Sequence, residues 1–374
     1  MRLMFVYYVN DDAGSAQSLY SYTHVARAQG HEVVIWGPKD TLRTPRPWSG
    51  VQISRAVAPS ASDNIEPMLT YSPDVESADA VIFVLETLYA LHPGGYLNLV
   101  RLMSKVPRQR RVIIDNDGMY NDVIRADGDY NHTDAEASRR RTALYDSLSD
   151  RIYQPTFHPR RRGVRTFFFH GYDPALERAL EFRAKEYGMI YVGNNWFRWR
   201  PMHRLLQAIE PIRQQVGRIG VIGSGWETPP SSMPSPLRED GFRSDPVYLH
   251  KLQIELMPPV PVRQVIPSMS KGFFNPVLVR PLFNHLRLVN PRVFETLAAS
   301  TIPLFGQDPQ YIEEIYGRQA LELVLPEQGG EEKILDILYR PQYYAEVVGS
   351  IRRHLGVKHS YAVRFQELID IVES

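Results

Sequence analysis

Residues 289–305 place an arginine and a glutamate at the start of an expected helix, just ahead of an expected buried strand. Apolar residues recur along this helix at helical spacing, which turns Arg292, Glu295 and Thr296 away from its buried face. A guanidinium and a carboxylate at the mouth of a helix could hold an anion and a hydroxylated group of one ligand. They could equally form an ordinary ion pair at an exposed helix end, and the residue pattern alone leaves both interpretations open.

A second group of candidates follows an expected strand at residues 188–192. Gly193 and Asn194 open the loop, where a glycine would let a ligand approach the backbone closely. Arg198 and Arg200 come next, and either could offer a rigid guanidinium fork to a phosphate. Stacking of these arginines on the tryptophans between them, at an exposed surface, is the alternative interpretation.

Carboxylates and a glycine follow three expected strands of the N-terminal part, where ligands of open α/β sheets bind. Asp12 and Gly14 follow the first strand, Glu86 follows another, and Asp115 and Asp117 follow a third. They could orient or deprotonate an acceptor, or they could be ordinary turn residues that cap the next helix. Two carboxylates and one amide are too few for Mg²⁺ or Ca²⁺ unless substrate phosphates complete the shell, so we expect no metal site.

Two isolated residues complete the set of candidates. His170 ends an expected strand at residues 164–169 and could contact an acceptor, although a lone histidine is more often an ordinary loop residue. Lys271 follows an expected strand at residues 260–268. It is a further phosphate candidate, with a solvated loop lysine as the alternative.

The elements that would position these residues alternate between strand and helix. Strand, loop, helix and strand follow one another within residues 3–36, which is a βαβ unit and implies a parallel sheet covered on both faces. The alternation starts again at residue 188, after an expected charged helix at residues 175–187. The loop after the first strand has one glycine instead of the three of a dinucleotide fingerprint, so we expect neither NAD nor FAD.

Composition limits the class of protein. A chain of 374 residues suits two domains, and the absence of cysteine excludes disulfides and thiolate metal sites. Lys+Arg 43 against Asp+Glu 42 argues against general nucleic-acid binding. The apolar run at the N-terminus is too short for a signal peptide or a membrane span, so we expect a cytoplasmic protein without a membrane span.

The segment R-V-F-E-T-L-A-A-S-T-I-P-L at residues 292–304 resembles the R-x-F-E-x-x-A-x-G-x-x-P-L motif of GT-B glycosyltransferases. It is most similar to their CgeB-like branch, which is related to glycosyltransferase families 1 and 4. Residues 171–174, 191–195 and 359–364 resemble further segments of that branch. Two positions depart from the pattern: Arg287 stands where many relatives have an upstream glutamate, and Ser300 stands where glycine is usual.

The resemblance implies an α/β protein with two Rossmann-like domains, residues 1–173 and 174–357, that face each other across a cleft. A last helix at residues 358–374 would pack back on the first domain. The implied fold is GT-B.

The resemblance also implies a hexosyltransferase-like enzyme that moves a sugar from a nucleotide-diphosphate sugar to a hydroxyl of a small molecule or glycan. No metal and no other cofactor would be needed. Glu295 would contact the ribose, Arg198, Arg292 or Lys271 the diphosphate, and Asp117 would serve as general base or positioning group. A nucleotide-sugar epimerase or hydrolase, and a non-catalytic nucleotide-sugar-binding protein, are the open alternatives.

Overall fold

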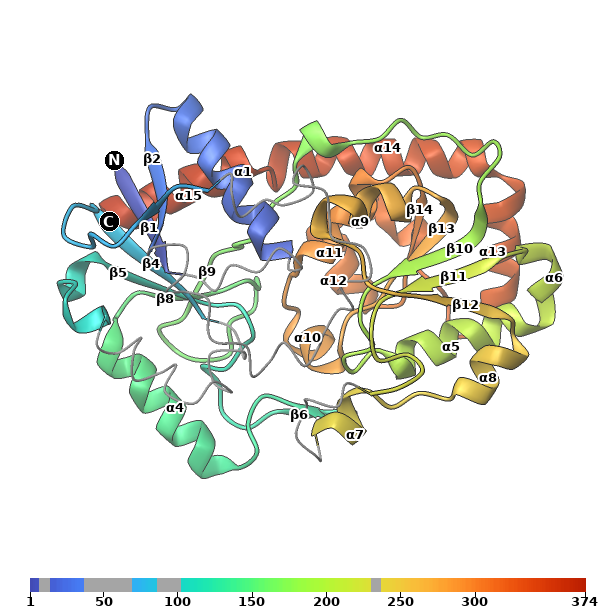
Figure 1. Cartoon of the computed structure of the whole chain (residues 1–374), viewed down its shortest axis with the longest axis horizontal. Helices are drawn as coiled ribbons and strands as arrows, with labels where there is room; N and C mark the ends of the chain where they lie inside the picture. The colour runs from blue at the N-terminus through green and yellow to red at the C-terminus, as the bar shows by residue number, and fades with distance from the viewer. Residues whose placement is uncertain (7–13, 37–68, 86–101, 230–236) are drawn as a thin grey trace.

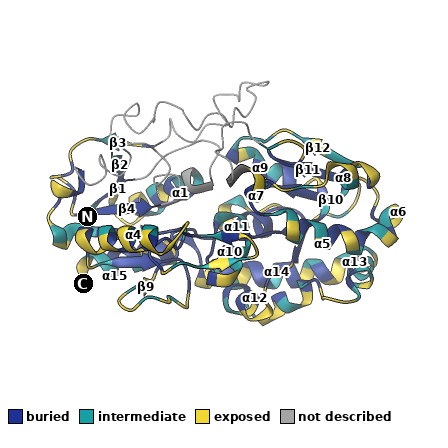
Figure 2. Ribbon diagram, turned by 90° about the horizontal axis from the view of Figure 1, so that it is seen from below, coloured by how far each residue is buried: buried dark blue, intermediate teal, exposed yellow. Residues whose placement is uncertain are grey.

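The computed structural model describes residues 1–6, 14–36, 69–85, 102–229 and 237–374 (Figure 1). These residues form two parallel β-sheets, one from each half of the chain, with helices on their faces. Figure 2 shows the buried strands of both sheets lying between helices whose outer surfaces are exposed. The domain boundaries expected from the sequence stay a prediction.

The first sheet contains seven strands, and all of its neighbouring pairs are parallel. In spatial order the strands are β3 (Tyr71–Ser72), β2 (Glu32–Trp36), β1 (Arg2–Val6), β4 (Ala80–Leu85), β5 (Arg111–Asp115), β8 (Ile152–Gln154) and β9 (Arg165–Thr166).

Apolar residues on both faces of the first sheet explain why its central strands are continuous hydrophobic runs. Leu3 and Phe5 of β1 join one buried cluster, and Met4 and Val6 join the cluster on the opposite face. Helix α1 (Gly14–Ala28) packs on the first cluster, and α4 (Ala135–Leu148) packs on the second. A hairpin of β6 (Arg125–Ala126) and β7 (Asp129–Tyr130), and the short η3 (Arg108–Arg110), complete this half.

The second sheet contains five strands that are again all parallel. In spatial order they are β12 (Ile254–Met257), β11 (Ile219–Ile222), β10 (Tyr187–Val192), β13 (Gly272–Val277) and β14 (Ile302–Phe305). The strand order reverses between β10 and β13. The helices and turns of this half are η4 (Pro174–Leu176), α5 (Trp199–Ile209), η5 (Glu210–Ile212), α6 (Arg213–Val216), α7 (Leu237–Gly241), α8 (Pro246–Lys251), α9 (Val262–Met269), α10 (Pro281–Leu286), α11 (Pro291–Ala298), α12 (Pro309–Tyr316), η6 (Arg318–Leu323), α13 (Gly330–Tyr339), α14 (Pro341–Lys358) and α15 (Tyr361–Glu373).

The last helix returns to the first half of the chain, as Figure 1 shows beside β1 and α1. Tyr361, Phe365 and Leu368 of α15 share a buried cluster with β1 and α1. The crossing is fixed where the Tyr172 amide donates to the His359 carbonyl at 2.7 Å and the Tyr361 amide donates to the Tyr172 carbonyl at 3.2 Å.

Two expected elements are wrong. Residues 175–187 form no long helix, because their backbone bonds to the turn after α11 instead: the Arg178 amide donates to the Ala298 carbonyl and the Glu181 amide to the Ser300 hydroxyl. The expected strand at 260–268 is helix α9, whose buried residues recur at helical spacing.

Candidate functional site

The candidate site lies at the carboxyl ends of β10, β13 and β14, where the strand order of the second sheet reverses. Ligands of doubly wound α/β sheets bind outside this edge, at the point of reversal. Three chain segments follow these strands: residues 193–198, residues 278–290 and residues 306–308.

Two glycine loops pack against each other at this edge. The Gly193 amide donates to the Ile222 carbonyl at 2.8 Å, and the Asn194 side-chain oxygen accepts from the Ser224 amide at 2.9 Å. Gly223 has φ +151°, and a Cβ there would overlap the Gly193 carbonyl. A Cβ on Gly193 would lie 2.6 Å from the Tyr191 hydroxyl. The close approach therefore requires glycine at both positions.

The Arg198 guanidinium is fixed at the end of β10 by backbone carbonyls alone. Its Nε donates to the Leu278 carbonyl at 3.3 Å, and its Nη1 donates to the carbonyls of Asn194 and Trp196, both at 3.2 Å. Burial lowers the pKa of Arg198, and the positive charge of Arg292 lowers it further. In the described part of the chain no carboxylate pairs with this cation, so a bound anion would be favoured beside it.

Arg292 and Glu295 lie at the start of α11, as the sequence predicts. Arg292 Nη1 and Glu295 Oε2 are 2.9 Å apart, and the Glu295 side chain is only 10% exposed. The angles at these two atoms do not form a hydrogen bond, so both keep their hydrogen-bonding capacity. Asn290, which precedes the helix, makes no capping bond, and both polar atoms of its amide are buried and unpaired within the described structure.

A buried ion pair joins the two halves beside these cations. Arg280 Nε donates to Asp129 Oδ2 at 2.8 Å, and Nη2 donates to Oδ1 at 2.5 Å. Burial acts to lower the pKa of Arg280, but the negative charge of Asp129 outweighs it and raises that pKa above its usual value. Asp117 makes a smaller contribution in the same direction. The ring centres of Trp196, Phe197 and Phe283 lie 5.2–5.7 Å from it. The sequence offers no signal for this pair, since its members are 151 positions apart.

A cavity of about 750 Å³ opens at the ends of β13 and β14. Residues of α5, α10 and the β6–β7 hairpin line it, and both polar and apolar side chains contribute to its surface. Two of its polar residues, Asn284 and Gln307, carry buried side-chain oxygens without a hydrogen-bond donor in the described structure. Gln307 is oriented by its amide nitrogen, which donates to the Val277 carbonyl at 2.7 Å.

The structure does not bring all of the predicted donor residues to this edge. Lys271 lies at the amino end of β13, where its Nζ is 3.2 Å from Glu186. The Thr296 hydroxyl is buried and donates to the Arg292 carbonyl one turn back. Arg200 lines the cavity but forms an exposed ion pair with Asp127 of the hairpin.

Asp115, a predicted acceptor residue, is fully occupied by its own fold. Its carboxylate accepts from the amides of Met119 and Tyr120 and from the side chains of Gln154 and Tyr145, at 2.8–3.2 Å. Burial raises its pKa to about 6. These contacts match the turn interpretation, in which the carboxylate closes the loop after β5.

Asp117, the predicted base, is half-buried in the loop after β5. The neighbouring Gly118 packs so closely against Leu286 and Leu288 that a Cβ would lie 2.7 Å from a Leu286 methyl. The charge of Asp117 makes a small contribution to raising the pKa of Arg280.

Two of the remaining acceptor candidates, His170 and Gly14, lie within the described residues. His170 Nδ1 lies 2.9 Å from the Ser18 hydroxyl, and burial lowers its pKa to about 3, so the imidazole is neutral. Gly14 is the first residue of α1. Asp12 and Glu86 lie outside the described residues.

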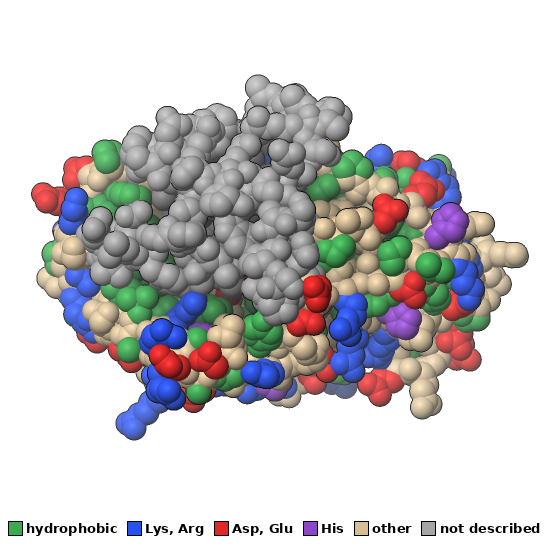
Figure 3. All heavy atoms as spheres, turned by 60° about the horizontal axis from the view of Figure 1, so that its bottom comes forward, with side chains coloured by type: hydrophobic (Ala, Val, Ile, Leu, Met, Phe, Trp, Pro, Cys, Tyr) green, Lys and Arg blue, Asp and Glu red, His purple; other side chains and the backbone are tan. Residues whose placement is uncertain are grey.

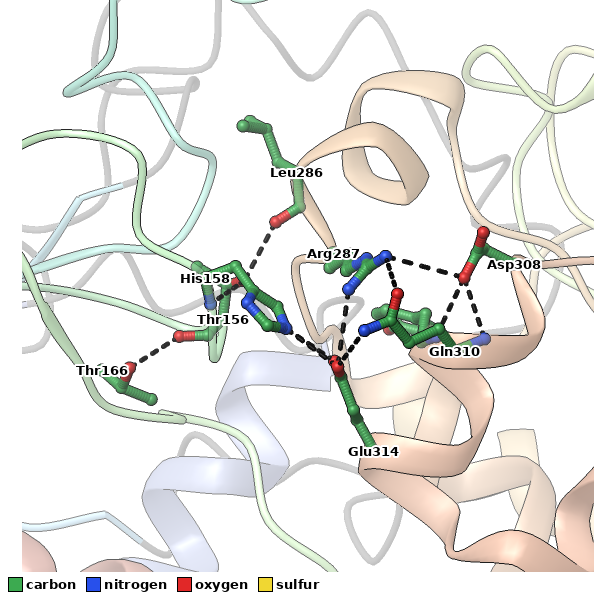
Figure 4. Close-up of polar contacts among 9 residues, drawn as sticks. Thr156, His158, Thr166, Leu286, Arg287, Asp308, Gln310 and Glu314 are labelled. Atoms are coloured by element: carbon green, nitrogen blue, oxygen red, sulfur yellow. Dashed lines mark hydrogen bonds and ion pairs between the residues drawn. The ribbon is translucent and has the colours of Figure 1, made fainter.

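The two departures from the family motif have structural explanations. Arg287, in the left-handed region at φ 52°, ends α10 and donates to the Gln310 side chain at 2.8 Å (Figure 4). Its Nη1 also lies 3.5 Å from Glu314, which accepts a 2.9 Å contact from His158 of the first half. Ser300 has no positive φ, and its amide and hydroxyl bond to Ser270 and to the backbone of Glu181.

The described residues contain no group of three or more His, Asp or Glu side chains placed to hold a metal ion. None of the helices within them is long and apolar enough to cross a membrane.

Several solved glycosyltransferases are similar to this structure over their whole length. An alpha-glucosyltransferase in complex with UDP and a 13-mer DNA superimposes with a TM-score of 0.65 at 13% identity, covering 100% of this chain and 99% of that chain. A beta-glucosyltransferase described as a DNA modifying enzyme gives 0.59 at 11% identity, covering 100% of both. Sucrose-phosphate synthase from Thermosynechococcus elongatus gives 0.58 at 12%, covering 100% and 98%. No protein-family model and no curated protein matches the sequence.

These likenesses, together with the two parallel sheets, show the GT-B fold that the sequence predicts. They also contradict one expectation: the net charge led us to expect no general nucleic-acid binding, but three of the similar structures are glucosyltransferases in complex with DNA. A net charge of +1 averages over the surface and is compatible with a local basic region. A CgeB-like relationship stays a prediction.

Proposed function

We propose that this protein is a glycosyltransferase that takes a sugar from a uridine-diphosphate sugar. The observation that carries the proposal is the convergence of Arg198, Arg292 and Glu295 at the point of strand reversal of the second sheet. Two of the similar structures contain UDP or UDP-glucose, which favours uridine over the other bases.

Arg198 and Arg292 would bind the diphosphate, and Glu295 would accept a hydrogen bond from a ribose hydroxyl. Burial lowers the pKa of Arg198, and the charge of Arg292 lowers it further. Burial raises the pKa of Tyr191, and both guanidinium groups oppose that rise. When the glycosidic bond breaks, negative charge develops on the leaving phosphate. Arg198, which backbone carbonyls already hold in place, would stabilise that charge without reorganising, and Arg292 and the N-terminus of α11 would add to the effect.

The sugar would enter the cavity at the ends of β13 and β14. The unpaired oxygens of Asn284 and Gln307 would accept hydrogen bonds from sugar hydroxyls. Arg287, which replaces the glutamate of the family motif, is already engaged by α12, so these two amides would replace the missing acid in this role.

The acceptor would be a hydroxyl on nucleic acid. The similar alpha-glucosyltransferase structures hold DNA that contains an HMU base, an abasic site or a mismatch. Asp117 is the proposed base or positioning group, because it is a half-buried carboxylate in the loop after β5 whose charge acts on Arg280.

The test is a thermal-shift series with UDP, GDP, dTDP, ADP and CDP, each with and without Mg²⁺. A ligand that binds only the folded state raises the melting temperature, and the rise grows with its affinity. We therefore expect UDP to give the largest shift. Arg198→Ala, Arg292→Ala and Glu295→Ala should each weaken UDP binding by about 1.5–3 kcal/mol, the cost of one charged hydrogen bond.

Lys271→Ala is the matched control, because this cation lies at the opposite edge of the same sheet. It should leave UDP affinity unchanged. Equal losses from Lys271→Ala and Arg292→Ala, or no shift with any nucleotide, would refute the proposed donor site.

A further inference from the structure

The first turn of α11 lacks a capping bond that comparable turns of this protein have. In the described part of the chain, the helices and turns that begin after an Asp or a Ser are capped by that side chain, which accepts from a backbone amide of the first turn. The capping residues are Asp134, Asp173, Asp245, Asp308 and Ser360. Asn290 precedes α11 with an extended backbone that suits a cap, yet its side chain makes no such bond.

Neither the residue type nor a proline at the first helical position explains this difference. Asparagine caps helices about as well as aspartate does. Asp245 and Asp308 are also followed by proline, and both cap their helices. The open first turn of α11 is therefore a property of its surroundings.

The chain on both sides of this turn is tightly held. At the C-terminal end of α11, the buried Arg352 of α14 donates from Nε to the Leu297 carbonyl at 2.7 Å and from Nη2 to the Ala299 carbonyl at 2.8 Å. Ahead of the helix, the Val289 amide donates to the Pro155 carbonyl of the first half at 2.9 Å. The missing cap is therefore not the result of a loosely packed segment.

The polar atoms at this open end are buried. Asn290 is 9% exposed, and both polar atoms of its side-chain amide are unpaired within the described structure. Arg292 Nη1 and Glu295 Oε2 are also buried there without a hydrogen bond. Figure 3 shows acidic and basic side chains intermixed on the exposed surface of one face, where water hydrates them. A buried amide without a partner has no such compensation, so it lowers the stability of the free protein.

An anion at this end of α11 would supply the missing partners. The N-terminus of a helix carries partial positive charge and unpaired N–H groups, and it binds phosphates for both reasons. Arg292 adds a guanidinium in the first turn, and Arg198 lies close enough for the charge of Arg292 to lower its pKa. The amide of Asn290 could donate an N–H to a phosphate oxygen and accept from a hydroxyl on the same ligand.

We propose that Asn290 is a ligand-binding residue and that a phosphate of the ligand takes the place of the missing cap on α11. The identity of the ligand rests on the proposed function, because the phosphate would belong to the nucleotide diphosphate. Asn290 is not among the donor residues that the sequence motif predicts. The free protein carries an unfavourable buried amide, and the bound ligand pairs with it.

The experiment compares the unmodified protein with Asn290→Asp and Asn290→Ala. Scanning fluorimetry without ligand gives the melting temperature, and calorimetry gives the affinity for UDP and for inorganic pyrophosphate. In Asn290→Asp the carboxylate caps α11 and repels the phosphate, so the melting temperature should rise by about 1 °C and both affinities should fall by about tenfold or more. Asn290→Ala removes the unpaired amide, so its melting temperature should not fall, while both affinities should fall by about fivefold to tenfold.

Asp245→Ala is the matched control, because it removes an ordinary cap that also stands ahead of a proline. The Asp245 carboxylate accepts from the Tyr248 amide at 2.9 Å. This variant should lower the melting temperature by about 1 °C and leave both affinities unchanged.

A fall in the melting temperature of Asn290→Ala like that of Asp245→Ala, or unchanged affinities in Asn290→Asp, would overturn the inference. If Arg292→Ala loses UDP while Asn290→Asp keeps it, the proposed donor site stands and the role of Asn290 fails. If pyrophosphate binds the unmodified protein more tightly than Asn290→Asp while UDP binds neither, the role of Asn290 stands and the uridine-diphosphate donor fails. No binding of either ligand by the unmodified protein would refute both.

Discussion

Asp129→Asn should destabilise the protein strongly, because it leaves the Arg280 guanidinium buried without a counter-charge. Both side chains are almost inaccessible to solvent, with 9% and 0% of their surface exposed. The carboxylate accepts three hydrogen bonds, two from Arg280 and one from the Leu282 amide at 3.0 Å. Removal of one member of such a buried pair costs about 3–5 kcal/mol.

The corresponding shift in melting temperature follows from the size of the chain. Unfolding entropy is about 2.1 cal/mol/K per residue, or roughly 0.8 kcal/mol/K for 374 residues. A loss of 3–5 kcal/mol therefore lowers the melting temperature by about 4–6 °C. Differential scanning fluorimetry of tryptophan emission at pH 7.5 would measure it.

The double variant Asp129→Leu, Arg280→Met separates an unpaired charge from a general packing defect. Three aromatic rings surround the guanidinium, so a methionine there is placed in an apolar environment. Replacement of a buried ion pair by apolar side chains is often nearly neutral. We expect the double variant to recover most of the lost stability, and with it most of the fall in melting temperature. The Leu282 amide, left without its acceptor, should still cost about 1 kcal/mol. A double variant as unstable as Asp129→Asn, or a single-variant shift under about 1 °C, would refute this reasoning.

Two further predictions concern the glycine loops and the buried histidine. Gly223→Ala should abolish UDP binding, because its Cβ would overlap the Gly193 carbonyl and its φ of +151° disfavours other residues; unchanged UDP affinity by calorimetry would contradict this. Burial lowers the pKa of His170 to about 3, so the unfolded state binds the proton more tightly than the folded state does. The contribution of His170 to stability is therefore present above pH 6.5 and is lost as the pH falls towards 3. The free energy of unfolding of His170→Asn should therefore fall less between pH 6.5 and 4 than that of the unmodified protein. If the two proteins lost the same free energy over this range, His170 would not be the buried neutral imidazole that we infer.

Local sequence pattern predicts the strands well, and it fails where tertiary contacts decide. The apolar runs at β1, β4, β10 and β14 are buried on both faces, which is why continuous hydrophobic stretches identify them. Residues 175–187 have helix-forming composition but lie along the turn after α11, where Lys185 donates to the carbonyls of Ser270 and Ser300. Those partners are distant in sequence and leave no local pattern.

The misplacement of Lys271 follows from one such error. If residues 260–268 were a strand, Lys271 would follow its carboxyl end, where ligands of parallel sheets bind. They form α9 instead, so Lys271 precedes β13 and lies at the amino edge. Val262, Val265, Ile266 and Met269 are buried at helical spacing, and this periodicity could have distinguished helix from strand.

Arg287 stands where the glycosyltransferase motif that the sequence resembles has a glutamate, and this difference helps to explain how the rest of the site is arranged. An arginine at that position adds a third cation near the donor edge unless another group neutralises it. Glu314 of α12 does so, and His158 of the first half binds the same carboxylate. Gln310 of α12 accepts a hydrogen bond from the same guanidinium. The position therefore ties α10, α12 and the first half together. Under the proposed function, the recognition of sugar hydroxyls would pass to Asn284 and Gln307, whose oxygens have no donor in the described structure.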